Sequence, residues 1–141
     1  MTSKQVIVMR KDLNMRKGKM VAQGAHASLK VILDMMTLSS GFEHMVTQGA
    51  DGVAKGYLDI HGGTALNDWI YGKFTKVCLG VDSEEELLEI VNQAQVAGLP
   101  CALITDAGLT EFNGVPTNTC CAIGPAWSEE IDAITGHLKL L

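Results

Sequence analysis

The sequence lacks any run of about 18 or more uninterrupted apolar residues, the length that a membrane-spanning helix needs. Its N-terminal stretch, MTSKQVIVMRKD, lacks the small-residue cleavage site of a secretory signal peptide. It also lacks internal repeats and low-complexity tracts, which argues against a repeat protein or a disordered one. We therefore expect a cytoplasmic protein without a membrane partner.

The sequence also lacks cysteine spacings typical of disulfides or zinc sites. Its cysteines, at positions 78, 101, 120 and 121, fall in runs that we predict to be central strands. Neighbours on a strand point to opposite faces, so Cys120 and Cys121 cannot bind one tetrahedral ion together. We expect buried free thiols, no metal and no cofactor. Ser83 and Ser128 are predicted helix caps, so no serine or cysteine has the neighbours of an activated nucleophile.

What is present is enough for one domain. At 141 residues, 47% of them hydrophobic, the chain can bury a core without disulfides or metals. Its net charge of −5 is unevenly placed. Basic residues gather early, at Lys4, Arg10, Lys11, Arg16, Lys17, Lys19 and Lys30, whereas acids crowd a later helix, at Asp82, Glu84, Glu85, Glu86 and Glu89. This distribution predicts one basic patch suited to phosphates, with ordinary solubilising lysines as the alternative.

Strand patterns alternate with helix patterns along the chain. We predict strands at 5–9, 74–81, 101–105 and 119–123, and helices at 18–36, 83–98 and 128–136. This order indicates an α/β domain of three layers, with a four-stranded mixed sheet flanked by helices. The first three strands should be largely parallel, and the fourth antiparallel because no helix precedes it.

The first predicted helix has an apolar face formed by Val21, Ala25, Leu29, Ile32 and Met36, which we expect to pack on the sheet. The Gly-, Ser- and Thr-rich stretch 37–67 predicts a long connection with a short helix near 42–46.

The start of this helix is unusual, because Arg16, Lys17 and Lys19 lie at the positive end of the helix dipole. Free backbone N–H groups, a glycine and three cations predict a site for a phosphate or an oxyanion, with a mobile surface turn as the alternative. Further along, Gln23, His26 and Lys30 continue from Lys19 as one polar stripe. This placement favours a cleft, although a single histidine is more often an ordinary surface or core residue.

A second polar cluster spans residues 105–119, between the third and fourth predicted strands. The carboxyl ends of parallel strands form the edge where ligands bind in α/β sheets. We therefore expect Asp106, Thr110, Thr117 and Thr119 to approach Lys19 at one rim. The alternative is that Asp106 only forms a turn, because an aspartate followed by a glycine is more often a turn former than a base.

Three separated segments carry a resemblance to a known family: KQVIVMRKDLNMRKGKMVAQGAHA (residues 4–27), DAGLT (106–110) and AIGPAWSEEIDAITGHLKLL (122–141). They resemble the type II (archaeal and eukaryotic-type) peptidyl-tRNA hydrolases. The middle segment WIYGKFTKVCLGVDSEEELLEI fits too, so the resemblance covers nearly the whole chain except about 37–66, an apparent insertion. It implies a mixed sheet between helices, a peptidyl-tRNA substrate, a frequent homodimer, no metal and no acyl-enzyme.

By position, the family's essential lysine corresponds to Lys19 and its essential aspartate to Asp106. The resemblance further implies cleft roles for Gln23 and His26 and for two threonines, Thr110 and Thr119. The pattern departs from the family at Pro116–Thr117, where the family usually has Gly-Thr or Gly-Ser and where the loop of this chain is one residue longer.

The predicted reaction is hydrolysis of the ester between peptide and tRNA. Asp106 would orient or activate a water, Lys19 would stabilise negative charge, and Thr110 and Thr119 would bind substrate or fix Asp106. We assign substrate binding to Arg16, Lys17, Gln23, Lys30 and Thr117, and leave open whether Asp106 or His26 accepts the proton. The alternative is a non-catalytic tRNA- or phosphate-binding protein, or an interaction protein, on the same scaffold.

Overall fold

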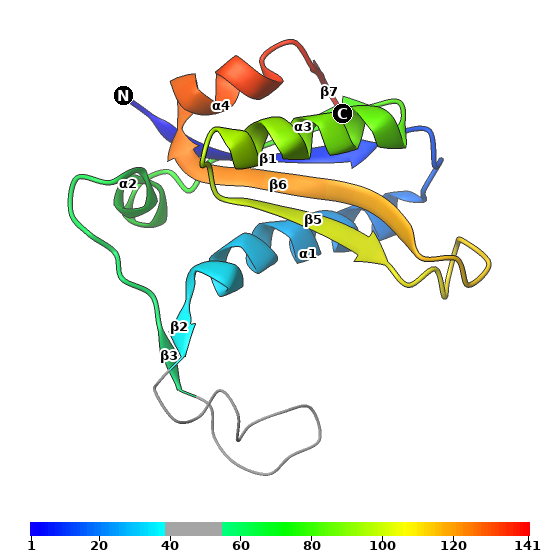
Figure 1. Ribbon diagram of the computed structural model, residues 1–141, viewed down its shortest axis with the longest axis horizontal. Helices are drawn as coiled ribbons and strands as arrows, with labels where there is room; N and C mark the ends of the chain where they lie inside the picture. Colours follow the sequence, from blue (N-terminus) through cyan, green and yellow to red (C-terminus); the bar gives the residue numbers. More distant parts are fainter. Residues whose placement is uncertain (39–54) are drawn as a thin grey trace.

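The computed structural model describes residues 1–38 and 55–141 (Figure 1). Its helices are α1 (Lys17–Met35), α2 (Ala65–Tyr71), α3 (Glu84–Val96) and α4 (Ser128–Thr135). Its strands are β1 (Ser3–Arg10), β2 (Thr37–Leu38), β3 (Gly56–Tyr57), β4 (Lys76–Val81), β5 (Cys101–Asp106), β6 (Thr117–Trp127) and β7 (Lys139–Leu140).

The main sheet has the strand order β5-β6-β1-β4-β7, with five strands instead of the predicted four. The fifth is the short β7, formed because the C-terminal tail returns antiparallel to β4. As predicted, β1, β4 and β5 run in one direction and β6 runs against them. However, β6 lies between β5 and β1, so β1–β4 is the single parallel pair of this sheet within the described residues.

Helices cover both faces of the sheet, which confirms the predicted three-layer α/β architecture (Figure 1). One face of β1 and β6 packs on α3 and α4, through residues such as Val8, Leu87 and Ile131. The other face packs on α1, through Ile7, Ala27 and Val31. The alternation of side chains along each buried strand supplies both cores at once.

Helix α1 turns a different face to the sheet than predicted. Val21 is 73% exposed and Leu29 is 58% exposed, whereas Gly24, Ala27 and Val31 are buried. Small residues at Gly24 and Ala27 let the helix backbone approach the sheet closely, and Gln23 joins them because its polar atoms find buried partners. The prediction that Val21 and Leu29 pack on the sheet is therefore wrong.

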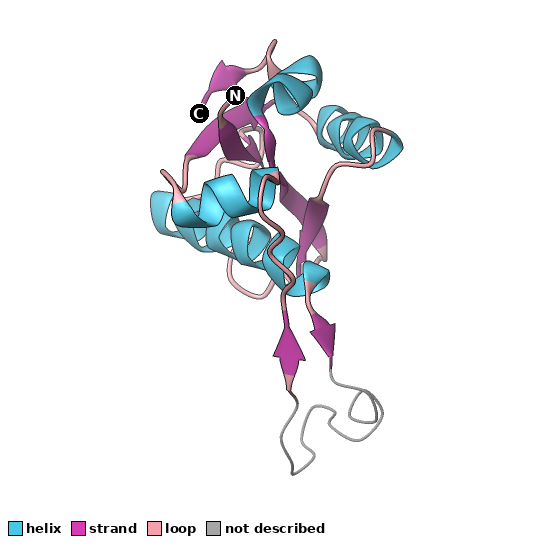
Figure 2. Cartoon of the chain, turned by 90° about the vertical axis from the view of Figure 1, so that its left-hand side faces the viewer, coloured by secondary structure: helices cyan, strands magenta, loops and turns pink. Residues whose placement is uncertain are grey.

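The remaining differences lie mostly at residues 37–75. Helix α2 and the β2–β3 ribbon, which projects from the body in Figure 2, were not predicted. The expected helix near 42–46 falls outside the described residues. Strand β4 begins later than predicted, since Phe74 has a positive φ of 56°.

The predicted serine caps and buried cysteines are each present only in part. The Ser83 side chain accepts the Glu86 N–H at 3.1 Å and caps α3 as predicted, whereas Ser128 caps nothing, because its hydroxyl lies 2.9 Å from that of Thr2. All four cysteines are free. Cys120 and Cys121 are buried as predicted, whereas Cys101 is partly buried and Cys78 is exposed, because Cys78 lines an open groove between α1, α2 and β4.

Candidate active site

Three segments far apart in the sequence meet at one end of the sheet: the first turns of α1, the loop after β5 and the first residues of β6. Asp106 closes β5 opposite Thr117 at the start of β6. Helix α1 crosses these two strands and brings its N-terminal half to the same place. The rim predicted from strand order is therefore present.

Lys19 and Asp106 form the centre of the site. The Lys19 ammonium donates to Asp106 Oδ1 at 2.8 Å and to the Thr110 hydroxyl at 2.9 Å. Both side chains of the ion pair are 14% exposed, so the pair is shielded yet open to a substrate on one side. The same ammonium lies over the ring of Phe112, 5.8 Å from its centroid, within the range of a cation–π contact.

Gln23 connects this pair to a buried threonine on β6. Its amide donates to Asp106 Oδ1 at 3.2 Å, and its carbonyl oxygen accepts the Thr119 hydroxyl at 2.5 Å. Thr119 is fully buried and Gln23 nearly so. Because the Thr119 hydroxyl donates, the Gln23 side chain is held with its NH₂ group toward Asp106. We call Lys19, Gln23, Asp106, Thr110 and Thr119 the reaction cluster.

The hydrogen bond from Lys19 lowers the pKa of Asp106 below its ordinary value of 3.8, and the Gly108 N–H and Gln23 add to the effect against the cost of burial. Asp106 is consequently an anion near neutral pH and a weak base. Burial alone would raise the pKa of Asp106, but the hydrogen bonds outweigh it. The carboxylate is instead suited to holding and aiming a polar group.

Gly108 contributes to the site and was not singled out from the sequence. Its N–H donates to Asp106 Oδ2 at 2.9 Å, so both carboxylate oxygens are fixed. It has φ of +82°, and a Cβ there would collide with the Val115 backbone. The Asp-Ala-Gly sequence was a usable signal, because an aspartate commonly accepts the N–H two residues later.

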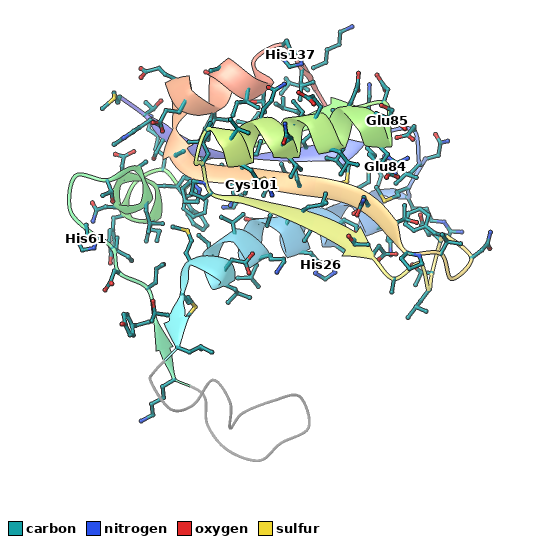
Figure 3. All side chains as sticks on the ribbon, viewed as in Figure 1. His26, His61, Glu84, Glu85, Cys101 and His137 are labelled. Atoms are coloured by element: carbon teal, nitrogen blue, oxygen red, sulfur yellow. The ribbon has the colours of Figure 1, made fainter. Side chains whose placement is uncertain are left out.

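Three predicted site residues lie apart from the reaction cluster. His26 is exposed and extends from α1 into solvent below β5 in Figure 3. Lys30 pairs with Asp34 at 3.1 Å on the helix surface. The Thr117 hydroxyl donates to the Val115 carbonyl at 2.8 Å, within its own loop.

The basic patch is smaller than predicted, because acids neutralise much of it. Arg10 is buried against Asp12 and reaches Glu84 at 3.5 Å, so the acidic helix α3 meets the basic segment instead of standing apart from it. Lys4 and Lys11 pair with Asp132 and Asp82.

At the start of α1, Arg16 and Lys17 remain exposed. Arg16 is 91% exposed and lies 3.8 Å from Glu111, while no side chain caps the helix start.

Two grooves flank α1. The first, here the apolar groove, has a volume of about 1120 Å³ and lies between α1, α2 and β4, lined mainly by Val21, Ala25, Leu29, Trp69, Ile70 and Phe74. The second, here the β5 groove, has a volume of about 890 Å³ and is lined by residues that include His26, Lys30, Leu33, Leu103, Ile104 and Thr105. The β5 groove adjoins the reaction cluster, since Thr105 precedes Asp106.

Within residues 1–38 and 55–141, no three His, Cys, Asp or Glu side chains are arranged to hold a metal ion. In the same residues no helix has the length and apolar character to cross a membrane. Every buried side-chain polar atom described has a hydrogen-bond partner, so the reaction cluster is a satisfied network.

Comparison with known proteins gives one consistent result. The family model described as peptidyl-tRNA hydrolase PTH2 matches residues 3–141. A peptidyl-tRNA hydrolase of Methanocaldococcus jannaschii is 41% identical over 138 residues, which are 98% of this chain and 99% of that protein. Proteins of the same name from Metallosphaera sedula (39% identical, 98% and 99% covered) and Methanopyrus kandleri (41% identical, 98% and 97% covered) agree.

Proposed function

This chain belongs to the peptidyl-tRNA hydrolase PTH2 family and hydrolyses the ester bond between peptide and tRNA, and we propose that the reaction cluster carries out this step. The observation that supports the site is the Lys19–Asp106 pair, whose atoms lie 2.8 Å apart at the rim where α1, β5 and β6 meet. A cation beside a fixed carboxylate offers both charge stabilisation and a water-binding group.

In the proposed reaction, Asp106 aims a water at the ester carbonyl carbon. The water oxygen bonds to that carbon, the bond from the acyl carbon to the ribose oxygen breaks, and one water proton ends on the ribose oxygen. Asp106 acts by orientation, because its lowered pKa makes it a weak base. Lys19 stabilises the negative charge that develops on the carbonyl oxygen.

The other members of the reaction cluster position these two groups. Gln23 and Gly108 donate to the two carboxylate oxygens of Asp106, and Thr119 fixes Gln23. Thr110, which is exposed and already bonded to Lys19, is placed to contact substrate. His26 lies apart from the cluster, and Asp106 is a weak base. We therefore assign the proton transfer to neither His26 nor Asp106.

The tRNA end of the substrate would lie at the start of α1. Uncapped backbone N–H groups and the exposed Arg16 and Lys17 favour phosphate there. Phosphate contacts of this kind are salt-dependent, which offers a way to separate tRNA binding from chemistry.

The proposal is tested by release of labelled peptide from N-blocked peptidyl-tRNA, with Asp106→Asn and Lys19→Ala beside the exposed control Lys139→Ala. We expect both cluster variants to lose about 100-fold or more in kcat/KM, with activity persisting in EDTA. Full activity in Asp106→Asn would refute the assigned site. Salt-sensitive tRNA binding without any hydrolysis would favour the non-catalytic alternative.

We further propose a single domain with an insertion at about 37–66, acting in the cytoplasm where translation supplies its substrate.

We also propose a homodimer. Exposed Val21, Leu29 and Phe74 beside the apolar groove support it, because apolar side chains gathered on one exposed surface commonly mark a contact between proteins. Sedimentation equilibrium would test this: Val21→Lys should shift a dimer toward monomer.

A further inference from the structure

We propose that the peptide part of the substrate binds in the β5 groove as an added strand, paired in parallel with the edge of β5. The inference rests on the proposed function, because it places the acyl side of the ester that the reaction cluster cuts. It gives a role to the surface occupied by His26 and Lys30, which the cluster leaves unused.

The first observation is that β5 is an edge strand. Within the described residues it pairs with β6 and with no other strand. Gly124 donates its N–H to the Pro100 carbonyl at 2.8 Å, which sets the phase of this ladder. Because bonding alternates along an antiparallel pair, Cys101 and Leu103 direct their backbone N–H and C=O groups away from β6. Such groups are the natural partners of an extended peptide.

The second observation is a wall beside that edge. The groove is lined by His26, Lys30 and Leu33 of α1 and by Leu103, Ile104 and Thr105 of β5. Leu33 is 54% exposed, so an apolar side chain is available to a ligand. An edge strand beside a helix forms a slot in which main-chain bonds bind any peptide and the wall contacts alternate side chains.

The third observation is continuity with the reaction cluster. Thr105 lines the groove and Asp106 follows it, while on α1 His26 lies about one turn after Gln23. The tRNA end is assigned to the start of α1, so the peptide must extend the other way, toward Cys101. With its ester end at Asp106, the peptide runs in the direction of β5.

The length of β5 limits how many peptide residues can pair with it. The strand has six residues, about 20 Å at the usual rise. With Asp106 beside the ester, the remaining five residues, 101–105, can pair with roughly five peptide residues. Main-chain pairing would not discriminate among side chains. An enzyme that must accept many peptide sequences needs this type of recognition.

The test compares tRNA esterified with one N-acetyl amino acid and with an N-acetyl pentapeptide ending in the same residue. We expect kcat/KM to be about tenfold higher for the pentapeptide. Leu33→Ser should remove most of this gain, and Leu88→Ser, an exposed leucine on α3 across the sheet, should keep it. N-methylation of one peptide amide in the substrate should cost about threefold to tenfold, because one outward carbonyl of β5 loses its donor.

Equal kcat/KM for the two substrates, or a gain that survives Leu33→Ser, would overturn the inference while leaving the hydrolase intact. A loss of the gain in Val21→Ser at unchanged oligomeric state, measured by sedimentation, would place the peptide in the apolar groove and also overturn it. A second measurement does not depend on catalysis: the N-acetyl pentapeptide amide is titrated into ¹⁵N-labelled protein. Shifts at the Cys101 and Leu103 amides support the inference even if no ester is cut, and their absence refutes it.

Discussion

The two sides of helix α1 lie against different surfaces and are built in different ways. On the side toward β5 and β6, Lys19 and Gln23 belong to a hydrogen-bonded network whose buried polar atoms are all paired. On the side toward α2 and β4, Val21 and Leu29 are exposed along the apolar groove. The apolar spacing along α1 therefore marks a solvent-facing side of the helix. Contacts between residues far apart in the sequence determine which side forms the site.

The largest expected effect is a loss of activity on substitution of Gln23, on the polar side of α1. We expect Gln23→Leu to lower kcat about 100-fold with little change in KM. Gln23 is 2% exposed and donates to Asp106, so we expect it to position the carboxylate and not, as the sequence had suggested, to bind substrate directly. Steady-state hydrolysis of peptidyl-tRNA measures this split. The matched control is Gln93→Leu on α3, which should leave both constants unchanged, and an equal fall in activity for the two variants would contradict the role of Gln23.

Gln23→Leu also leaves the Thr119 hydroxyl buried without its acceptor. We expect the free energy of unfolding to fall by about 1–3 kcal/mol. Adding Thr119→Val removes the unpaired hydroxyl, so stability should recover in the double variant while activity stays low. Recovery of activity together with stability would show that Gln23 acts only on folding.

The next prediction compares the free energy of unfolding when the same change, valine to alanine, is made at a buried and at an exposed position of α1. Val31→Ala removes methyl groups from a side chain that is 1% exposed, so we expect about 2 kcal/mol less free energy of unfolding. Val21→Ala, on the apolar groove side at 73% exposure, should change it by less than about 0.5 kcal/mol. Urea denaturation of both variants decides. Equal losses would show that Val21 is covered in solution, and in the proposed homodimer the second copy would cover it.

The electrostatics of the polar side can be separated from its packing by titrating Asp106. Its pKa lies below 3.8, chiefly because Lys19 donates to it. The lowered value means that the carboxylate stabilises the fold at pH values above its unfolded pKa, and this contribution disappears as pH falls through the folded pKa. In Lys19→Met we expect the Asp106 pKa to rise and the acid sensitivity of stability to weaken. Carboxyl ¹³C NMR follows the group directly; an unmoved pKa would show that Lys19 does not cause the shift.

The sequence predicted those parts of the fold that depend on local pattern. The bounds of α1 and α3 and the core of each long strand follow from apolar spacing and from the Ser83 cap. The edge strand β7 was missed because it is short and is held by tertiary contacts such as the Leu141 N–H to the Cys78 carbonyl, which no local pattern specifies. Helix α2 was missed because its seven residues are too few to show an apolar period, although Thr64 caps it by accepting the Asn67 N–H at 3.2 Å.

The same division holds for the site. Lys19, Asp106 and Thr119 were selected by the rim argument and by resemblance, and the structure places them together. His26 has the same helical spacing as Lys19 and Gln23 but does not join their hydrogen-bonded cluster, because residues at this spacing on a long helix can lie against different neighbours. The Gln23–Thr119 bond joins residues 96 positions apart, so the burial of Gln23 could not be inferred from spacing.

The smallest expected effect concerns Gly24, which lies on the buried strip of α1 between its two sides. A Cβ added there would lie 3.8 Å from the Ile7 side chain and 3.9 Å from Met9, an ordinary packing distance. Gly24→Ala should therefore raise the free energy of unfolding by about 0.5–1 kcal/mol, because alanine loses less backbone entropy in a helix than glycine. Thermal unfolding measures the gain, and Gly108→Ala, whose Cβ would meet the Val115 backbone, should have the opposite sign. If Gly24→Ala destabilises instead, the close approach of α1 to the sheet requires glycine, and the spacing that aligns Lys19 and Gln23 with Asp106 is fixed by that contact.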